Sequence, residues 1–356
     1  MPPQADPAPL NRVDPNRVAP VPAAGVAPDH AAPAKPSRAW LFFSILAIVL
    51  WGVFGAVSKG ASNAVPSAVD LQVISTLGVV PIALLLIASP NFSRRTGSLG
   101  KGIAYGVATG VCGSVGNLAV FGSMALGGDA STVYPLSGVY PLVTVVLAVL
   151  ILRERLNVIQ VLGMGLALVA LFLFNAPQDA GPATAPAAGA AAAWWKTLVA
   201  PWMALALVGL VLYGVAGVTQ KLATNHVSTE LSTVCFALAF IPVALVAMGW
   251  QAAQGAPVNW HLPGRAWLLS VLTGALISTG TLTLFAAYRT GKASVVTALT
   301  ALYPALTVVL AVKLFDEPMG GRKVFAIAAA LAAGVALTYE KPAPATASPL
   351  APGGEP

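Results

Sequence analysis

The chain has 356 residues, of which 57% are hydrophobic and 9% are charged, with a formal net charge of +7. Soluble domains carry about 25% charged residues, so this chain could not cover a water-exposed surface. A soluble fold is therefore excluded, and lipid must be the solvent for most of the protein. The basic residues lie at the ends of apolar stretches without the aromatic interleaving of a nucleic-acid groove, which argues against a nucleic-acid partner.

Ten apolar stretches are long enough to cross a hydrocarbon core of roughly 30 Å, which requires about 20 residues per helix. The predicted spans, in chain order, are residues 39–60, 68–89, 100–126, 130–152, 157–175, 202–222, 228–250, 266–288, 293–315 and 322–339. The sequence thus predicts an all-α integral membrane protein with ten transmembrane helices.

Three segments outside these spans are rich in Pro and Ala. Residues 1–38 carry no cleavable signal pattern and are expected to form a disordered tail. Residues 176–201 are expected to be a Pro/Ala/Gly linker, and residues 341–356 a second Pro-rich tail. These segments separate and flank the two groups of spans.

The distribution of Lys and Arg predicts how the chain is oriented in the membrane. Threading the spans in alternation places thirteen of the nineteen basic residues on the side of the N-terminus and six on the other side. Cytoplasmic loops are enriched in Lys and Arg, so both termini are predicted to be cytoplasmic in a multi-pass protein of the cell membrane.

The two halves of the chain resemble each other at a spacing of about 163 residues. The run Thr144–Val149 recurs without a mismatch as Thr307–Val312. Residues 39–175 and 202–340 are therefore predicted to be two copies of one five-helix unit. Because five is odd, the second copy must enter the membrane from the opposite side. The halves are then inverted about a pseudo-twofold axis in the membrane plane, an arrangement that suits alternating access.

The repeat also carries a resemblance to a known family. Tyr140-Pro141 and Tyr303-Pro304 lie in the fourth helix of each half, and Arg153-Glu154-Arg155 closes the first copy. In these features the chain resembles the EamA-type branch of the drug/metabolite transporter superfamily, over roughly residues 39–340. The second copy ends Phe315-Asp316-Glu317-Pro318, which keeps the acid without the flanking arginines. The resemblance implies a central cavity lined by the first, third, fourth, sixth, eighth and ninth helices.

Polar side chains recur on one face of the third span and of its counterpart, the eighth. Because a polar group facing hydrocarbon is costly, such faces are expected to look onto protein or water. The candidates for substrate binding on this face are Ser114 and Asn117 in the third span, and Ser278 and Thr281 in the eighth. Neighbouring glycines have the alternative role of letting helices approach closely. Asn117 differs from them because a buried amide needs hydrogen-bond partners.

The fourth and ninth spans share a second polar face, with a proline beside a tyrosine in each. The candidates for substrate binding here are Ser137, Tyr140, Thr144, Thr300, Tyr303 and Thr307. Pro141 and Pro304 cannot donate to the carbonyls four residues earlier, so each is expected to kink its helix. The freed carbonyls either bind substrate or are satisfied by neighbouring hydroxyls. Tyr140 and Tyr303 are the first choice for testing because the feature occurs in both copies.

Four charged residues at helix ends complete the set of candidates. Lys59 and Lys221 end the first helix of each half, where a lysine either snorkels to the interface, binds anionic substrate groups or takes part in gating. Asp70 and Glu230 begin the second and seventh spans, where the helix dipole stabilises an acid. Proton coupling is the alternative role for these two acids.

The inverted repeat with paired polar faces predicts secondary active transport of a small metabolite, with an amino acid or a related compound as the expected class. Export of drugs or toxic cations is the alternative within transport, although no acid can be placed at mid-membrane to neutralise a cation. A membrane-embedded enzyme or scaffold is the alternative from another class. The spans offer no nucleophile–base pair and no paired acids, so the protein is not expected to be an enzyme.

The expected partners are the lipid bilayer and a small-molecule substrate, with a coupling proton and a second copy of the chain in a homodimer left open. No cofactor or metal is expected, because the three histidines are scattered outside the spans. Primary pumping is not expected either, since the sequence has no Gly-x-x-x-x-Gly-Lys-Ser/Thr phosphate-binding loop.

Overall fold

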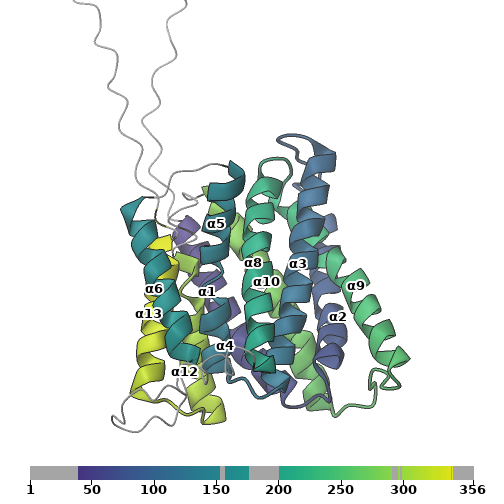
Figure 1. Ribbon diagram of the computed structural model, residues 1–356. Helices are drawn as coiled ribbons and strands as arrows, with labels where there is room; N and C mark the ends of the chain where they lie inside the picture. The colour runs from purple at the N-terminus through teal and green to yellow at the C-terminus, as the bar shows by residue number, and fades with distance from the viewer. Residues whose placement is uncertain are drawn as a thin grey trace, which may run out of the picture. The chain divides into compact units, whose positions relative to one another are not determined.

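A computed structural model describes residues 39–152, 157–175, 200–290, 296, 299–337 and 339 (Figure 1). The described helices of the first half are α1 (Ala39–Ser62), α2 (Ala68–Ile87), α3 (Leu99–Ala125), α4 (Ala130–Ser137), α5 (Pro141–Leu152) and α6 (Val158–Asn175). Those of the second half are α8 (Pro201–Thr224), α9 (Thr229–Ala253), α10 (Gly264–Thr290), α12 (Tyr303–Phe315) and α13 (Gly321–Leu337). The predicted all-helical fold is confirmed.

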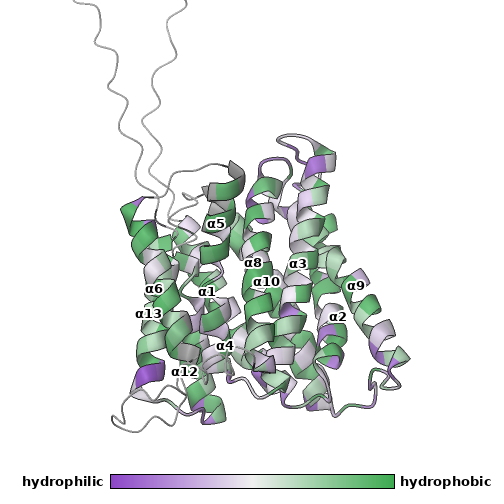
Figure 2. Cartoon of the chain, viewed as in Figure 1, coloured by the Kyte–Doolittle hydropathy of each residue, from purple (hydrophilic) through white to green (hydrophobic). Residues whose placement is uncertain are grey.

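Six of the described helices, α1, α2, α3, α8, α9 and α10, are each long and apolar enough to cross a membrane. Figure 2 shows hydrophobic residues along most of their length, with hydrophilic residues mainly at helix ends and in the loops. The remaining predicted spans correspond to α6, α12 and α13 and to the pair α4 and α5. The two halves thus have the duplicated arrangement of spans that the repeat predicts.

The predicted span 130–152 is interrupted rather than continuous. α4 ends at Ser137 and α5 begins at Pro141, so the helix stops over residues 138–140. Pro141 has no N–H to donate to the Ser137 carbonyl. That carbonyl instead accepts a hydrogen bond from the Tyr140 N–H at 3.1 Å. The interruption therefore places Tyr140 in non-helical backbone between two helices.

The two halves exchange equivalent contacts. α1 packs against α10 and α12 of the second half, while α8 packs against α3 and α5 of the first. Thr307 Oγ1 donates to the Gly52 carbonyl at 3.0 Å, and Thr144 Oγ1 donates to the Gly214 carbonyl at 3.0 Å. Each residue has its repeat counterpart in the matching contact, as expected for repeats related by a pseudo-twofold axis.

Two repeat-related glycines bring helices of opposite halves into backbone contact. A Cβ atom at Gly274 in α10 would lie 2.7 Å from the carbonyl carbon of Ser75 in α2, and closer still to its oxygen. At Gly110 in α3, a Cβ atom would lie 2.8 Å from the Cα of Phe236 in α9, and closer still to its carbonyl oxygen. These contacts agree with the close-packing role considered for the glycines.

Several predicted features lie outside the described residues. They are the tails 1–38 and 341–356, most of the linker 176–201, the cluster Arg153-Glu154-Arg155, and the start of the ninth span. The division of the chain into repeats at residues 39–175 and 202–340 stays a prediction.

Candidate functional site

A cavity of about 100 Å³ lies between the two halves, roughly midway along α1, α3 and α8. Such a volume has room for several water molecules or a small solute. Side chains from α1, α3, α8, α9, α10 and α12 line it, together with Tyr140 from the interruption between α4 and α5. The cavity is thus built from both repeats, where the pseudo-twofold axis is expected.

Six of the fourteen residues that line the cavity are aromatic. The rings that line it are those of Trp51, Phe54, Tyr140, Tyr213, Phe236 and Tyr303. Trp51 of α1 and Tyr303 of α12 meet edge to face, with ring centroids 5.5 Å apart and planes at 70°. Such a contact fixes the orientation of both rings.

Four neutral polar side chains interrupt the aromatic wall: Thr109, Asn117, Gln220 and Thr281. Among the described residues that line the cavity, none is Asp, Glu, Lys, Arg or His. A charged solute would therefore enter this site without an opposite charge to meet it, which is costly in a dehydrated cavity.

The Asn117 amide is hydrogen-bonded to a neighbouring helix. Its side chain is 2% exposed, and its Oδ1 accepts a hydrogen bond from the Tyr213 hydroxyl. No other hydrogen bond to this amide is present among the described residues. Because the amide oxygen is engaged, the NH₂ group is the part of Asn117 left to donate to a solute.

Four of the predicted site residues line the cavity: Asn117, Tyr140, Thr281 and Tyr303. Thr281 is the repeat counterpart of Asn117, and its hydroxyl donates to the Ile277 carbonyl at 2.8 Å within its own helix. The two faces of the site therefore differ chemically, with an amide on one side and a self-bonded hydroxyl on the other.

The other predicted hydroxyl groups lie outside the cavity lining. Ser114 accepts a hydrogen bond from Gln72 Nε2 at 2.8 Å, and Ser278 is fully buried. Ser137 donates to the Tyr134 carbonyl and Thr300 to the Val296 carbonyl. Thr144 and Thr307 make the interhelical bonds described above. Ser114, Thr144 and Thr307 thus bond to other helices, whereas Ser137 and Thr300 bond to the backbone of their own span.

The two lysines differ in their surroundings. Lys59 Nζ donates to the Gly128 carbonyl, in the turn between α3 and α4, at 3.1 Å. Lys221 is exposed at the last turn of α8, next to Gln220 of the cavity wall. Neither lysine lines the cavity among the described residues.

Asp70 binds backbone and side-chain donors at the end of the bundle. The side chain is 1% exposed, and its oxygens accept hydrogen bonds from Ser67 Oγ at 2.5 Å and Asn259 N at 2.8 Å. Asp70 thus holds the loop between α9 and α10. Glu230 lies in the first turn of α9, which Ser228 caps by accepting from Leu231 N at 3.1 Å.

Sequence reasoning missed most of the aromatic wall, including Trp51 and Tyr213. These two residues are repeat counterparts at a spacing of 162 residues. Tyr213, Gly217 and Gln220 also follow one helical face at i, i+4 and i+7, a pattern that could have identified them. Aromatic residues are ordinary in membrane helices, so a pattern of polar residues alone does not single them out.

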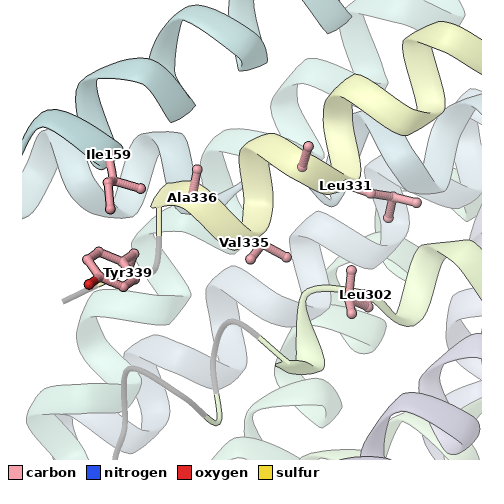
Figure 3. A pocket seen from close by; sticks show the side chains of 7 residues that line it. Ile159, Leu302, Leu331, Val335, Ala336 and Tyr339 are labelled. Carbon is pink, nitrogen blue, oxygen red and sulfur yellow. The ribbon is translucent and has the colours of Figure 1, made fainter. Parts of the chain in front are cut away.

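A second cleft, of about 400 Å³, lies beside α6 and α13 (Figure 3). Its labelled side chains are hydrocarbon except for the Tyr339 hydroxyl. Ile159, which lines it, is 39% exposed on the outside of the bundle. Binding sites for polar solutes need a few convergent polar groups, which this cleft does not offer among the described residues.

Comparisons with known proteins agree with this architecture. The EamA-like transporter family matches residues 38–176 and 200–339. A solved structure titled "Crystal structure of protein" is similar, with a TM-score of 0.56 and 21% sequence identity. The match covers 85% of this chain and 96% of the chain in that structure. At that identity the likeness shows the fold alone. No functionally curated protein matches the sequence.

Proposed function

The chain belongs to the EamA-like transporter family, a family of membrane transporters rather than enzymes, and from this premise we propose that it is a secondary active transporter of a small metabolite. The observation that supports this proposal is the cavity between the two halves, lined by aromatic and neutral polar side chains from both repeats. Rocking of one repeat against the other would expose such a site to each side of the membrane in turn.

The chemistry of the cavity wall supports a substrate without net charge. An isolated charge is costly to bury, and no charged side chain lines the cavity among the described residues. An amino acid or a related compound is the class we propose, because it carries no net charge and its ammonium and carboxylate groups can bind the neutral donors and acceptors of the wall. The apolar part of the substrate would pack against the aromatic rings.

We assign substrate contacts to the predicted residues that line the cavity. The Asn117 amide donates to an acceptor oxygen of the substrate, and Tyr213 holds that amide in place. Tyr140, Thr281 and Tyr303 contact the remainder of the substrate. We assign packing roles to Ser114, Ser137, Thr144, Ser278, Thr300 and Thr307.

Export of an organic cation is the second candidate function. The aromatic rings of the wall support it, because a cation is attracted to the face of Trp or Tyr within about 6 Å. In this alternative the aromatic rings would attract the cation in place of a carboxylate side chain.

Counterflow in proteoliposomes distinguishes these functions. Vesicles preloaded with one unlabelled solute are tested against radiolabelled amino acids, their uncharged analogues and quaternary ammonium ions. We expect exchange of a solute without net charge, with Asn117→Leu lowering the exchange rate about threefold to tenfold because one hydrogen bond to the substrate is lost. Gly165→Ala is the control, since Gly165 is exposed on α6 and no atom lies within 4 Å of an added Cβ. Exchange confined to quaternary ammonium ions would support the cation exporter, and no exchange of any solute would contradict transport by this site.

We further propose that the protein lies in the cell membrane with both termini cytoplasmic, as the distribution of basic residues indicates. A coupling proton and a homodimer stay predictions. Proton coupling through Asp70 would require its carboxylate to leave the hydrogen bonds that it accepts from Ser67 and Asn259.

A further inference from the structure

The cavity reaches different distances toward the two ends of the bundle. Along α8 its lining extends to Gln220, four residues before the helix ends at Thr224. Along α1 the lining stops at Phe54, eight residues before the helix ends at Ser62. We call these the Lys221 end and the Lys59 end, after the lysine in the last turn of each helix.

A layer of buried aromatic side chains closes the cavity toward the Lys59 end. Phe54 packs against Tyr134 of α4 with ring centroids 5.9 Å apart, and against Phe121 of α3 at 6.5 Å. The three side chains are at most 3% exposed. The Tyr134 hydroxyl is hydrogen-bonded to Ser58 Oγ of α1. This layer joins three helices of the first repeat, directly beyond the last cavity-lining residue of α1, Phe54.

Beyond this layer, a carboxylate of the second repeat binds the start of α4. Glu317 follows α12, is 6% exposed, and uses both carboxylate oxygens. Its Oε1 accepts from Ala130 N at 2.8 Å, and its Oε2 accepts from Ser131 N at 2.7 Å. Hydrogen bonds to an ionised acceptor are strong, and the positive end of the helix dipole adds to them. Glu317 therefore fixes α4, which carries Tyr134, to the loop between α12 and α13.

An ion pair stands beside this contact. Lys323 Nζ, in the first turn of α13, lies 2.9 Å from Asp129 Oδ2, and the Asp129 side chain is 32% exposed. By sequence, the repeat counterpart of Asp129 is Lys292 and that of Lys323 is Gln160. A lysine and a glutamine cannot form an ion pair, so this ion pair is not repeated at the counterpart positions. Glu317 does have an acidic counterpart, Glu154, which lies outside the described residues. The ion pair thus distinguishes the Lys59 end from the Lys221 end.

We propose that Glu317 and Lys323 form a latch on the start of α4 and the residue before it, Asp129, which keeps the cavity closed at the Lys59 end. This inference rests on the proposed transport by alternating access, in which each end must open in turn. Opening the Lys59 end separates the start of α4 from the α12–α13 loop, because Tyr134 must move away from Phe54. The latch opposes that separation, and the ion pair biases the resting protein toward closure at this end.

Cysteine accessibility tests the latch without a substrate. The reporter is Ala216→Cys, a small cavity-lining position on α8, in a protein with Cys112 and Cys235 replaced by Ala. A membrane-impermeant methanethiosulfonate is added to right-side-out or inverted vesicles. A second reporter, Gln254→Cys in the exposed turn after α9, shows which vesicles present the Lys59 end to the reagent.

Two variants weaken the Glu317 contact in independent ways. Glu317→Gln replaces one acceptor oxygen by an NH₂ group. Ala130→Pro removes one backbone donor, at a first helical position where proline is favoured, and Asp129 already has the extended backbone (φ −72°, ψ 139°) that precedes a proline. We expect the labelling rate of the Ala216→Cys reporter from the Lys59 end to rise about tenfold or more in both variants. A weaker latch increases the fraction of molecules that are open at this end.

The ion pair predicts a smaller and reversible effect. Asp129→Asn and Lys323→Gln should each raise labelling from the Lys59 end about twofold to fivefold, the range for a partly exposed pair. The charge-swapped double variant Asp129→Lys with Lys323→Asp should return the rate toward the reference. Equal labelling of the reference protein from both ends would overturn the latch, as would unchanged labelling in Glu317→Gln and Ala130→Pro. Counterflow is measured separately, so failure of the latch leaves the proposed function standing.

Discussion

The contact between α2 and α10 makes a quantitative prediction about Gly274. Replacing Gly274 by Ala places a Cβ atom 2.7 Å from the carbonyl carbon of Ser75, whereas ordinary contact begins at 3.4 Å. The two helices must therefore separate by at least 0.7 Å, the difference between these distances. The neighbouring atoms belong to backbone, which cannot rotate out of the way as a side chain could.

The energetic cost follows from the lost dispersion contacts. A gap of 0.5–1 Å forfeits about a quarter to a half of the attraction between facing atoms. For an interface with on the order of 40 close pairs at 0.1–0.2 kcal/mol each, the loss is about 1–4 kcal/mol. Alanine also favours the helix by about 1 kcal/mol relative to glycine, which offsets part of this loss. Gly165→Ala has the same helix-propensity gain without the clash, so comparing the two variants isolates the packing cost.

The free energy of unfolding can be measured by titrating SDS into detergent micelles and following tryptophan fluorescence. We expect Gly274→Ala to be about 1–4 kcal/mol less stable than Gly165→Ala. Equal stability of the two variants would refute the reasoning, because it would mean that α2 and α10 separate without cost.

Three further predictions concern packing, proton coupling and orientation. Thr307→Val removes the hydroxyl that binds the Gly52 carbonyl, and the same titration should show a loss near 0.6 kcal/mol, about the average for interhelical bonds in membranes; an unchanged stability would speak against the packing role. Asp70→Asn weakens the contact with Asn259 and should cost about 1–2 kcal/mol while leaving the pH profile of counterflow unchanged; a lost pH dependence would instead assign Asp70 to proton coupling. Green fluorescent protein fused to either terminus should fluoresce in cells, since both ends are predicted to be cytoplasmic, and a dark fusion at either end would contradict that orientation.

The helices could be predicted closely from sequence because their limits are set by local signals. The span 68–89 is observed as α2, Ala68–Ile87, and the span 228–250 as α9, Thr229–Ala253. Both begin at serine caps, Ser67 and Ser228, whose hydroxyls accept hydrogen bonds from the N–H groups of Asp70 and Leu231. Long apolar runs bounded by such caps leave little choice of register.

The interruption before α5 could not be predicted from its proline alone. Pro81 lies inside α2 and Pro242 inside α9, and both helices continue through them. Before Pro141 the helix stops at Ser137, four residues earlier, with Gly138 as the cap of α4. Whether a membrane helix kinks or breaks at proline depends on the partners available to the freed backbone groups, which are set by neighbouring helices.

The cavity lining was partly predictable. Among the described residues, Asn117 does not bond to a carbonyl of its own helix. Its amide oxygen accepts from the Tyr213 hydroxyl of another helix at the cavity. Thr300, in contrast, satisfies its hydroxyl on the carbonyl four residues earlier, as Ser and Thr readily do in helices. A hydroxyl in a span therefore says little about where it points, whereas an amide indicates a polar neighbour.

The exchange of partners between the halves has a consequence for how the protein is made. α1 leaves the ribosome long before α10 and α12, the helices of the second half against which it packs. Contacts so distant in sequence form late and slowly. During synthesis the first five helices therefore reside in the membrane with their interfaces unpaired, exposed to degradation or to pairing with another nascent chain. Translation must proceed past α12 before all contacts of α1 can form, so truncation before α12 removes part of the packing of α1.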